Sequence, residues 1–126
     1  MAQNILCVED NPDNMVLLRR ALEARGYKMI PAKNGLEGVE AAEREDVALI
    51  LLDINLPDID GYEVARRVRA SSKPGLASVP IIAITANALK GDAERALEAG
   101  CDVYMSKPIN IRELWARMES YFPSKV

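Results

Sequence analysis

The chain has 126 residues, of which 49% are hydrophobic and 28% are charged, and its formal net charge is −3. This length predicts one domain with a core of its own, and the composition excludes an intrinsically disordered chain. The sequence holds no histidine and no CxxC motif, which excludes acid–base chemistry on imidazole and the usual zinc sites.

Five short apolar runs alternate with stretches in which apolar residues recur at helical spacing. The runs predict strands over residues 4–8, 27–32, 48–53, 79–85 and 102–107. The amphipathic stretches predict helices whose apolar positions are Met15, Leu18 and Leu22; Leu36, Val39 and Ala42; Tyr62, Val64 and Val68; Ala93, Ala96 and Leu97; and Ile111, Leu114, Trp115, Met118 and Phe122. This alternation predicts an α/β fold with a parallel sheet, right-handed crossovers and helices on both faces.

Local signals at the element boundaries agree with this pattern. Gly26 and Gly100 stand where helices should end, and Asn34-Gly35 predicts a turn. Asn110, followed three residues later by Glu113, predicts a capping pair at the start of the last helix. On that helix we expect Met118 in the core, whereas Trp115 fits the core and a partner-facing patch equally well.

The sequence carries no signal for a membrane or for nucleic acid. No apolar stretch is long enough to span a bilayer, and the N-terminus lacks the basic-then-apolar order of a signal peptide, so we expect a cytoplasmic protein. The densest basic cluster, Arg66, Arg67 and Arg69, falls on a mostly solvated helix face and is too small to predict direct contact with nucleic acid. Cys7 and Cys101 lie in or beside apolar stretches, which predicts buried, unpaired thiols.

Polar residues gather where the predicted strands end. Glu9 and Asp10 follow the first strand, Asp53 ends the third, Thr85 ends the fourth and Lys107 ends the fifth. In the strand order 2-1-3-4-5, the first and third strands are neighbours, and ligands of open parallel sheets bind beyond the carboxyl ends of the strands. We therefore expect three carboxylates, one hydroxyl and one ammonium to converge on one edge.

This set of groups suggests phosphoryl transfer assisted by a metal ion. Clustered carboxylates call for a divalent cation, and a purely oxygen ligand set favours Mg²⁺, with Mn²⁺ as an alternative. We expect Asp10, Asp53 and the backbone carbonyl of Asn55 to be direct ligands and Glu9 to act through water. Asp53 can then attack a phosphoryl group as a nucleophile while Lys107 and Thr85 balance the charge on the phosphoryl oxygens. Taken singly, each residue also fits an ordinary polar turn or strand end.

Four segments resemble one known family. These are "CVEDN", "LLDINLPDIDG" with Asp53, "IIAITA" with Thr85, and "YMSKP" with Tyr104 and Lys107. They are similar in spacing and context to the receiver domains of two-component response regulators, over essentially the whole chain. The chain looks most like the stand-alone receivers that lack an output domain, so we expect a single receiver domain over residues 1–126. The resemblance implies a flavodoxin-like, doubly wound, three-layer fold with five strands and five helices.

The resemblance also implies a function. In this family, a sensor histidine kinase or a histidine phosphotransferase passes a phosphoryl group from a phosphohistidine to the residue that matches Asp53, and the receiver later removes it. Thr85 and Tyr104 match the switch residues, which change the surface of the fourth helix, fifth strand and fifth helix for a downstream protein partner. Asn55 and Asn87 match positions that tune the lifetime of the phosphoryl group. The protein is then a signalling phosphoacceptor rather than an enzyme with a separate substrate.

Rival functions differ in what they need from the sequence. A flavodoxin cradles phosphate after its first strand, where the acidic "EDNPDN" would repel one. A haloacid-dehalogenase-type phosphatase needs a second Asp two residues after the nucleophile, where this chain has Asn55. Two alternatives stay open: a degenerate receiver that docks partners without phosphorylation, and a receiver cut from a hybrid kinase.

Overall fold

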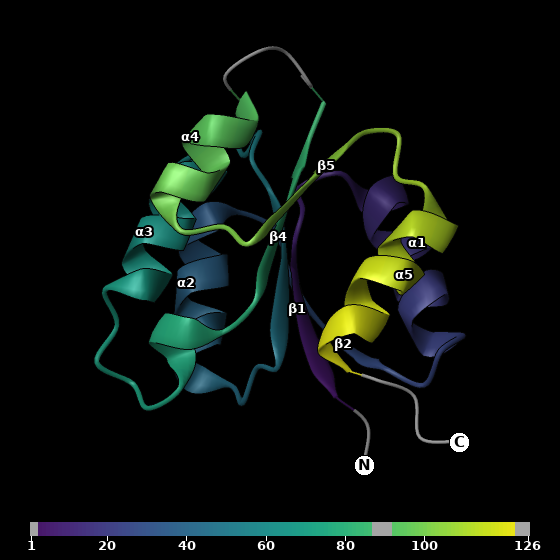
Figure 1. Cartoon of the computed structure of the whole chain (residues 1–126), viewed down its shortest axis with the longest axis horizontal. Helices are drawn as coiled ribbons and strands as arrows, with labels where there is room; N and C mark the ends of the chain where they lie inside the picture. The colour runs from purple at the N-terminus through teal and green to yellow at the C-terminus, as the bar shows by residue number, and fades with distance from the viewer. Residues whose placement is uncertain (1–2, 87–91, 123–126) are drawn as a thin grey trace.

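A parallel sheet with helices on both faces makes up the structure (Figure 1). The computed structural model describes residues 3–86 and 92–122. The strands are β1 (Asn4–Val8), β2 (Lys28–Ala32), β3 (Leu49–Asp53), β4 (Ile81–Thr85) and β5 (Val103–Ser106). The helices are α1 (Pro12–Glu23), α2 (Gly35–Arg44), α3 (Gly61–Arg69), α4 (Asp92–Ala99) and α5 (Ile111–Tyr121), with a short 3₁₀ turn, η1 (Leu76–Ser78), before β4.

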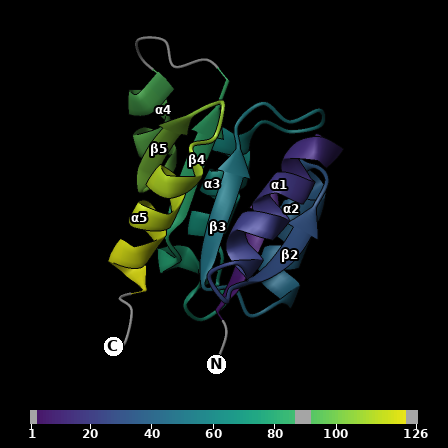
Figure 2. The ribbon, with the colours of Figure 1, turned by 90° about the vertical axis from the view of Figure 1, so that its right-hand side faces the viewer.

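The strands lie in the order β2-β1-β3-β4-β5 and every neighbouring pair is parallel. Helices α1 and α5 cover one face of the sheet, and α2, α3 and α4 cover the other (Figures 1 and 2). This arrangement confirms the predicted doubly wound, flavodoxin-like fold. Some strands begin up to two residues later than the apolar runs suggested; β4, for example, begins at Ile81 rather than at Val79.

The core consists of two layers that the sheet separates. Alternate residues of a strand point to opposite faces, so Ile5 and Cys7 of β1 pack on the side of α1 and α5 while Leu6 and Val8 pack on the other side. All residues of β3 and β4 are buried. Strands covered on both faces read as continuous apolar runs, which is why these two were easy to recognise in the sequence.

Two predicted features of the helices were wrong. Asn34 and Gly35 do not form a free turn, because Asn34 caps α2 by accepting a hydrogen bond from the Glu37 N–H (2.9 Å) and Gly35 is the first helical residue. Leu36 and Leu97 do not face the core, since their exposed fractions are 52% and 57%. Small residues instead form the buried stripes of these helices. On α2 they are Gly35, Gly38, Ala41 and Ala42, and on α4 they include Ala96 and Ala99.

Other boundary signals were right. Gly26 and Gly100 follow the ends of α1 and α4 with φ angles of 81° and 108°, the left-handed region that glycine adopts without strain. Asn110 caps α5 by accepting a hydrogen bond from the Glu113 N–H at 3.0 Å. These residues set where the crossover helices stop and start.

Trp115 joins α5 to α1, while Met118 is fully buried as expected. The indole Nε1 of Trp115 donates a hydrogen bond to the Ala21 carbonyl of α1 at 2.9 Å. The guanidinium of Arg25 stacks over the ring, 4.1 Å from its centroid, and pairs with Glu119 at 3.1 Å. Trp115 is therefore a half-buried contact between two helices.

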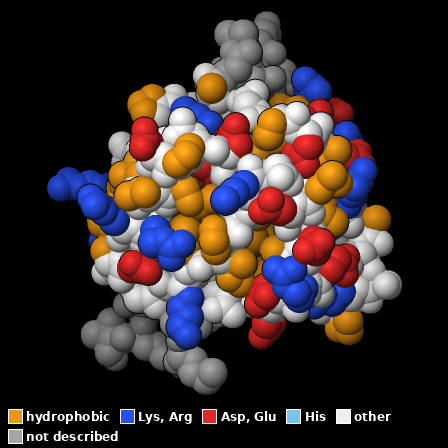
Figure 3. Space-filling view, turned by 180° about the vertical axis from the view of Figure 1, so that it is seen from behind, with side chains coloured by type: hydrophobic (Ala, Val, Ile, Leu, Met, Phe, Trp, Pro, Cys, Tyr) orange, Lys and Arg blue, Asp and Glu red, His pale blue; other side chains and the backbone are white. Residues whose placement is uncertain are grey.

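The surface seen in Figure 3 is mixed in charge, and both thiols are buried as expected. Basic, acidic and apolar side chains are interspersed on the face seen in Figure 3, without a continuous basic stripe. None of the helices within residues 3–86 and 92–122 is both long and apolar enough to cross a bilayer. Cys7 and Cys101 are buried and unpaired, and burial raises the pKa of both thiols.

Arg69 departs from its predicted place on a solvated face. Arg66 and Arg67 are exposed and pair with Glu63, as expected. The side chain of Arg69 is only 22% exposed, and its guanidinium donates to the carboxylate of Asp102 at 2.8 Å. It also donates to three backbone carbonyls, which belong to Ala77, Val79 and Gly100. Arg69 thus ties the end of α3 to the segments that enter β4 and β5.

We expect Arg69→Ala to lower the free energy of unfolding by about 2–3 kcal/mol, because it removes the guanidinium donor from three backbone carbonyls and one of the two donors of Asp102. Arg67→Ala is the matched control on the same helix, and its exposed ion pair should be worth no more than about 0.5 kcal/mol. Urea denaturation of the two variants and the wild type measures the difference. Equal destabilisation by both variants would show that Arg69 does not stabilise the connection between α3 and the segments that enter β4 and β5.

Candidate functional site

The carboxyl ends of the strands bring the predicted site residues to one edge of the sheet. Glu9 and Asp10 directly follow β1, and Asp53 is the last residue of β3. Because β1 and β3 are neighbours in register, with Val8 opposite Leu52, these carboxylates meet across the two strands. The strand order therefore brings together residues that lie more than 40 positions apart, as expected from the sequence.

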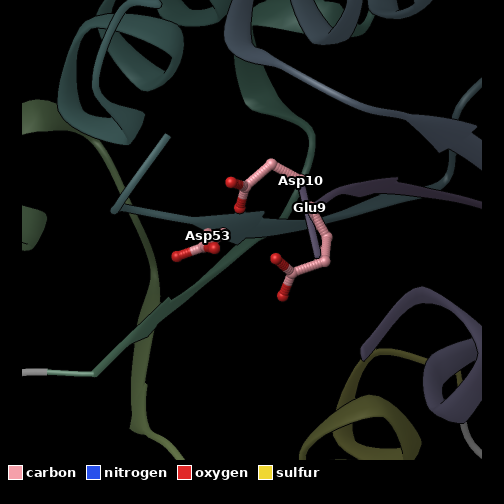
Figure 4. A group of neighbouring side chains, drawn as sticks. All are labelled: Glu9, Asp10 and Asp53. Atoms are coloured by element: carbon pink, nitrogen blue, oxygen red, sulfur yellow. The ribbon is translucent and has the colours of Figure 1, made fainter. Parts of the chain in front are cut away.

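Three carboxylates share a small space at this edge (Figure 4). Glu9, Asp10 and Asp53 each offer an oxygen atom, and these atoms lie within 4.8 Å of one another. Glu9 and Asp53 are buried, with exposed fractions of 3% and 2%, whereas Asp10 is exposed. Like charges at this distance and burial repel strongly, so the cluster needs a compensating positive charge.

Lys107 supplies part of that charge. Its ammonium lies 2.9 Å from Oδ2 of Asp53 and 3.7 Å from Oε1 of Glu9. Burial alone would lower the pKa of Lys107, but the hydrogen bond and charge of Asp53, with the charges of Glu9 and Asp10, raise it above its ordinary value. One ammonium does not balance the charge of three carboxylates, and a divalent cation would neutralise the remainder.

Glu9 is held by the residues that follow it. Its Oε2 accepts a hydrogen bond from the Asn11 N–H at 3.1 Å, and its Oε1 accepts one from the Asn14 side chain at 3.3 Å. Burial raises the pKa of Glu9 to about 7; the Asn11 N–H opposes this rise, while the hydrogen bond and charge of Asp53 add to it. The role of Asn14 was missed, although its place in the first turn of a helix after an acidic pair is a usable signal.

The loop after β3 approaches Asp53 from the side. The Asn55 N–H donates a hydrogen bond to Oδ1 of Asp53 at 2.9 Å. The side-chain oxygen of Asn55 accepts one from the Ala86 N–H at 3.3 Å, which links this loop to the end of β4. We predicted the backbone carbonyl of Asn55 as a metal ligand and Asn55 as a position that tunes the phosphoryl lifetime, and its side-chain contact with Ala86 is an addition to both.

Thr85 and Tyr104 lie on the strands that continue the site. Thr85 is 1% exposed at the end of β4, and its carbonyl accepts a hydrogen bond from the Lys107 N–H at 2.8 Å. Tyr104 lies opposite Ala83 in the register of β4 and β5, is half-buried, and packs against the core layer of α2, α3 and α4. Asn87 lies outside the described residues.

Asp58 was also missed by sequence reasoning. Its Oδ1 and Oδ2 accept hydrogen bonds from the Gly35 and Leu36 N–H groups at the start of α2, both at 2.8 Å. Burial would raise the pKa of Asp58, but these backbone N–H groups hold it below its ordinary value. A carboxylate is a common partner for a helix start, yet the 22 or 23 positions between these residues hide the pair in the sequence.

The donor set decides what the site can hold. All three cluster members offer carboxylate oxygen, and among the described residues the cluster includes no histidine or cysteine. Such hard ligands suit Mg²⁺ better than zinc. The neighbouring ammonium of Lys107 adds a group that can bind an anionic oxygen.

Comparison with known proteins gives a consistent family. Residues 5–119 match the family described as response regulator receiver domain. The polar-differentiation response regulator DivK of Brucella anthropi is 41% identical over 121 residues, which cover 96% of this chain and 97% of that protein.

Two solved structures are also similar. The receiver domain of the sensor histidine kinase PA1611 of Pseudomonas aeruginosa, solved with a magnesium ion coordinated in its active site cleft, has a TM-score of 0.88 and 40% identity over 98% of this chain and 100% of that one. A chain in the co-crystal structure of the Saccharomyces cerevisiae histidine phosphotransfer protein Ypd1 with the Ssk1 receiver domain has a TM-score of 0.86 and 32% identity, over 95% of this chain and 88% of that one. The chain therefore belongs to the response regulator receiver domain family and is a DivK-like receiver of a two-component signalling system.

Proposed function

We propose that the protein accepts a phosphoryl group on Asp53 from the phosphohistidine of a sensor histidine kinase or a histidine phosphotransferase. The observation that carries this proposal is a buried carboxylate at a strand end, hydrogen-bonded to an ammonium and surrounded by two further carboxylates. A carboxylate in this setting has no structural purpose in the core, where an apolar residue would be more stable. The phosphorylated protein then signals through contacts with another protein.

The transfer needs a positioned nucleophile and a place for negative charge. An oxygen of Asp53 forms a bond to phosphorus while the phosphorus–nitrogen bond of the donor breaks, and the imidazole nitrogen keeps the electron pair and takes up a proton. The Asn55 N–H, 2.9 Å from Oδ1 of Asp53, limits rotation of the carboxylate. Lys107, now paired with Asp53, is close enough to follow the incoming phosphoryl oxygens, and the Thr85 hydroxyl would donate to another.

The acidic cluster fits a resident Mg²⁺. Asp10, Asp53 and the Asn55 carbonyl would hold the ion directly, whereas Glu9, with its longer side chain, would act through water. When bound, Mg²⁺ neutralises the cluster and stabilises charge on the phosphoryl oxygens. The magnesium ion coordinated in the active site cleft of the similar PA1611 receiver supports Mg²⁺ as the ion. Mn²⁺ takes the same kind of oxygen ligands and would be the alternative ion.

The likeness to partner-bound and regulatory proteins supports the proposed partners. A chain similar to this one was solved together with the histidine phosphotransfer protein Ypd1, which supports a phosphohistidine donor. The similarity to the response regulator DivK supports output by protein contact. The proposed output surface comprises α4, β5 and α5, because β5 carries Tyr104 and leads directly to Lys107.

Phosphorylation would act as a switch through Thr85 and Tyr104. The Thr85 hydroxyl would move toward the phosphoryl group, and the half-buried ring of Tyr104 would turn into the space left behind. A full change from about 1:99 to 99:1 between two surface states needs about 5.5 kcal/mol of differential interaction. A dianionic phosphoryl group that contacts a cation, Lys107 and Thr85 can supply energy of this order.

We expect the wild type to gain one phosphoryl group from acetyl phosphate in the presence of Mg²⁺, measured as intact mass. Asp53→Asn should gain none, because the amide is not a nucleophile for phosphorus. Asp46→Asn makes the same change before the other end of β3 and should behave as the wild type. A wild type that gains no phosphoryl group, even from a phosphohistidine donor, would favour a docking module that works without phosphorylation.

The pKa of Glu9 predicts how stability depends on pH and on the cation. The folded protein binds the Glu9 proton more tightly than the unfolded chain, since its pKa is about 7 against an ordinary 4.5. Stability without a cation should therefore fall as pH rises through this interval and stay lower above it. Mg²⁺ should raise the melting temperature more at about pH 8 than at about pH 5, where the proton already neutralises Glu9.

Glu9→Gln is the matched variant for this prediction. In a chelator at about pH 8 it should melt about 4 °C above the wild type, the shift that ~1 kcal/mol gives in a domain of this size. At about pH 5 the two should melt closer together. Thermal denaturation followed by circular dichroism measures both effects, and a pH-independent gain would contradict the electrostatic cause.

The switch predicts separate roles for Asp53 and Tyr104. Tyr104→Ala should keep the Mg²⁺-dependent mass gain but lose most of the phosphorylation-dependent change in hydrogen exchange over residues 92–121. Tyr104→Phe keeps the ring and should retain most of that change. An unaltered exchange response in Tyr104→Ala would show that the ring does not couple the site to the surface.

A further inference from the structure

The loop of residues 54–60, between β3 and α3, carries Asn55 and is fixed at both of its ends. At its start, the Ile54 N–H donates to the Ile84 carbonyl of β4 at 2.9 Å. Where it meets α3, the Gly61 N–H donates to the Ile54 carbonyl at 3.0 Å. Near its start, the Leu56 N–H also donates to the Ile54 carbonyl at 3.2 Å and the Asn55 side chain accepts from the Ala86 N–H at 3.3 Å, so the stretch that still needs an anchor is residues 57–60.

Asp58 supplies an anchor to α2. Its two carboxylate oxygens accept the N–H groups of Gly35 and Leu36, each at 2.8 Å, in a bidentate contact with the start of the helix. A carboxylate is favoured here because the first N–H groups of a helix have no partner within the helix and carry partial positive charge. The contact is charge-assisted and therefore stronger than a neutral hydrogen bond.

The loop and the start of α2 are closely packed beside this contact. A Cβ atom on Gly35 would lie 2.5 Å from Cγ1 of Ile59 and 2.9 Å from the Ile59 carbonyl oxygen. The loop and the start of α2 therefore lie in direct contact. Asp58 fixes the orientation of the loop relative to α2, since both of its carboxylate oxygens accept hydrogen bonds from the helix.

We infer that Asp58 is a positioning residue for the phosphoryl acceptor. By holding the loop on α2, it keeps the Asn55 N–H against Oδ1 of Asp53 and the Asn55 carbonyl at the place of the cation. Asp58 lies three residues from Asn55 and acts through the backbone, without touching the reacting atoms. The inference deepens the proposed function and rests on it for the roles of Asp53 and Asn55.

A purely structural role, in which Asp58 only caps α2, makes a different prediction. Asn34 already caps the same helix start from within the local sequence, by accepting the Glu37 N–H at 2.9 Å. Asn34→Ala and Asp58→Ala would therefore both loosen the start of α2. Only Asp58→Ala also releases the loop that carries Asn55.

Two measurements on the unphosphorylated protein separate these roles. The first is the solvent exchange rate of the Asn55 amide proton by NMR, in a chelator. The second is the dissociation constant of Mg²⁺, from its titration into the metal-free protein. Asp58→Ala should raise the exchange rate and should weaken Mg²⁺ binding about tenfold, the low end of what contacts behind the ligands contribute to metal affinity. Asn34→Ala should change neither, and Asp58→Asn, which keeps one acceptor, should fall between.

Two outcomes would overturn the inference. One is an Asn55 amide that exchanges at the wild-type rate in Asp58→Ala, and the other is an equal rise in Asn34→Ala, which would reduce Asp58 to a helix cap. The exchange measurement needs neither Mg²⁺ nor a phosphoryl donor. A wild type that fails to bind Mg²⁺ or to gain a phosphoryl group would therefore count against the proposed function, while the exchange rates would still decide the role of Asp58.

Discussion

Repulsion among three carboxylates at one edge of the sheet is the constraint on which the rest of the site depends. Glu9, Asp10 and Asp53 bring oxygen atoms within 4.8 Å of one another, and two of the three side chains are almost completely buried. A folded domain has only about 5–15 kcal/mol of net stability, so such a cluster is tolerated only when the rest of the fold holds it in place. The continuous apolar runs of β1 and β3 do this, because each strand is packed on both faces up to the residue before the acidic group.

The same repulsion explains why the neighbouring groups are arranged as they are. Lys107 bonds to Asp53, and backbone or amide N–H groups bond to Glu9 and to Asp53, so positive ends of dipoles face the cluster from several sides. These contacts reduce the free-energy cost of burying the carboxylates without neutralising the negative charge of the cluster. What remains is a site that favours a cation, and through the cation an anionic oxygen.

The fold and the residues at the strand ends could be predicted from the sequence, because they follow from the spacing of apolar residues and from the order of the strands. Apolar runs of strand length alternating with amphipathic helices allow few topologies, and the strand order then dictates which polar ends meet. The errors came from long-range contacts, which the spacing of apolar residues along the sequence does not indicate. Leu36 and Leu97 point outward because alanine and glycine form the buried stripes, and Arg69 is drawn inward by carbonyls from distant segments. Asp58 was missed for the same reason, since it lies in a loop and its partners are on the distant helix α2.

The two ends of β4 and β5 are held in different ways, and this difference bears on the proposed switch. At their amino ends, the carboxylate of Asp102 accepts both the Arg69 guanidinium and the Ile81 N–H, each at 2.8 Å, which ties the start of β4 to α3 and to the segment entering β5. At their carboxyl ends, the Lys107 N–H bonds to the Thr85 carbonyl, while the Lys107 side chain is paired with Asp53. A phosphoryl group on Asp53 would redirect Lys107 and Thr85 but leave the Arg69 contacts untouched. The response is then expected to begin at the carboxyl ends, and Tyr104, which lies opposite Ala83 two residues before Thr85, is placed between the two ends.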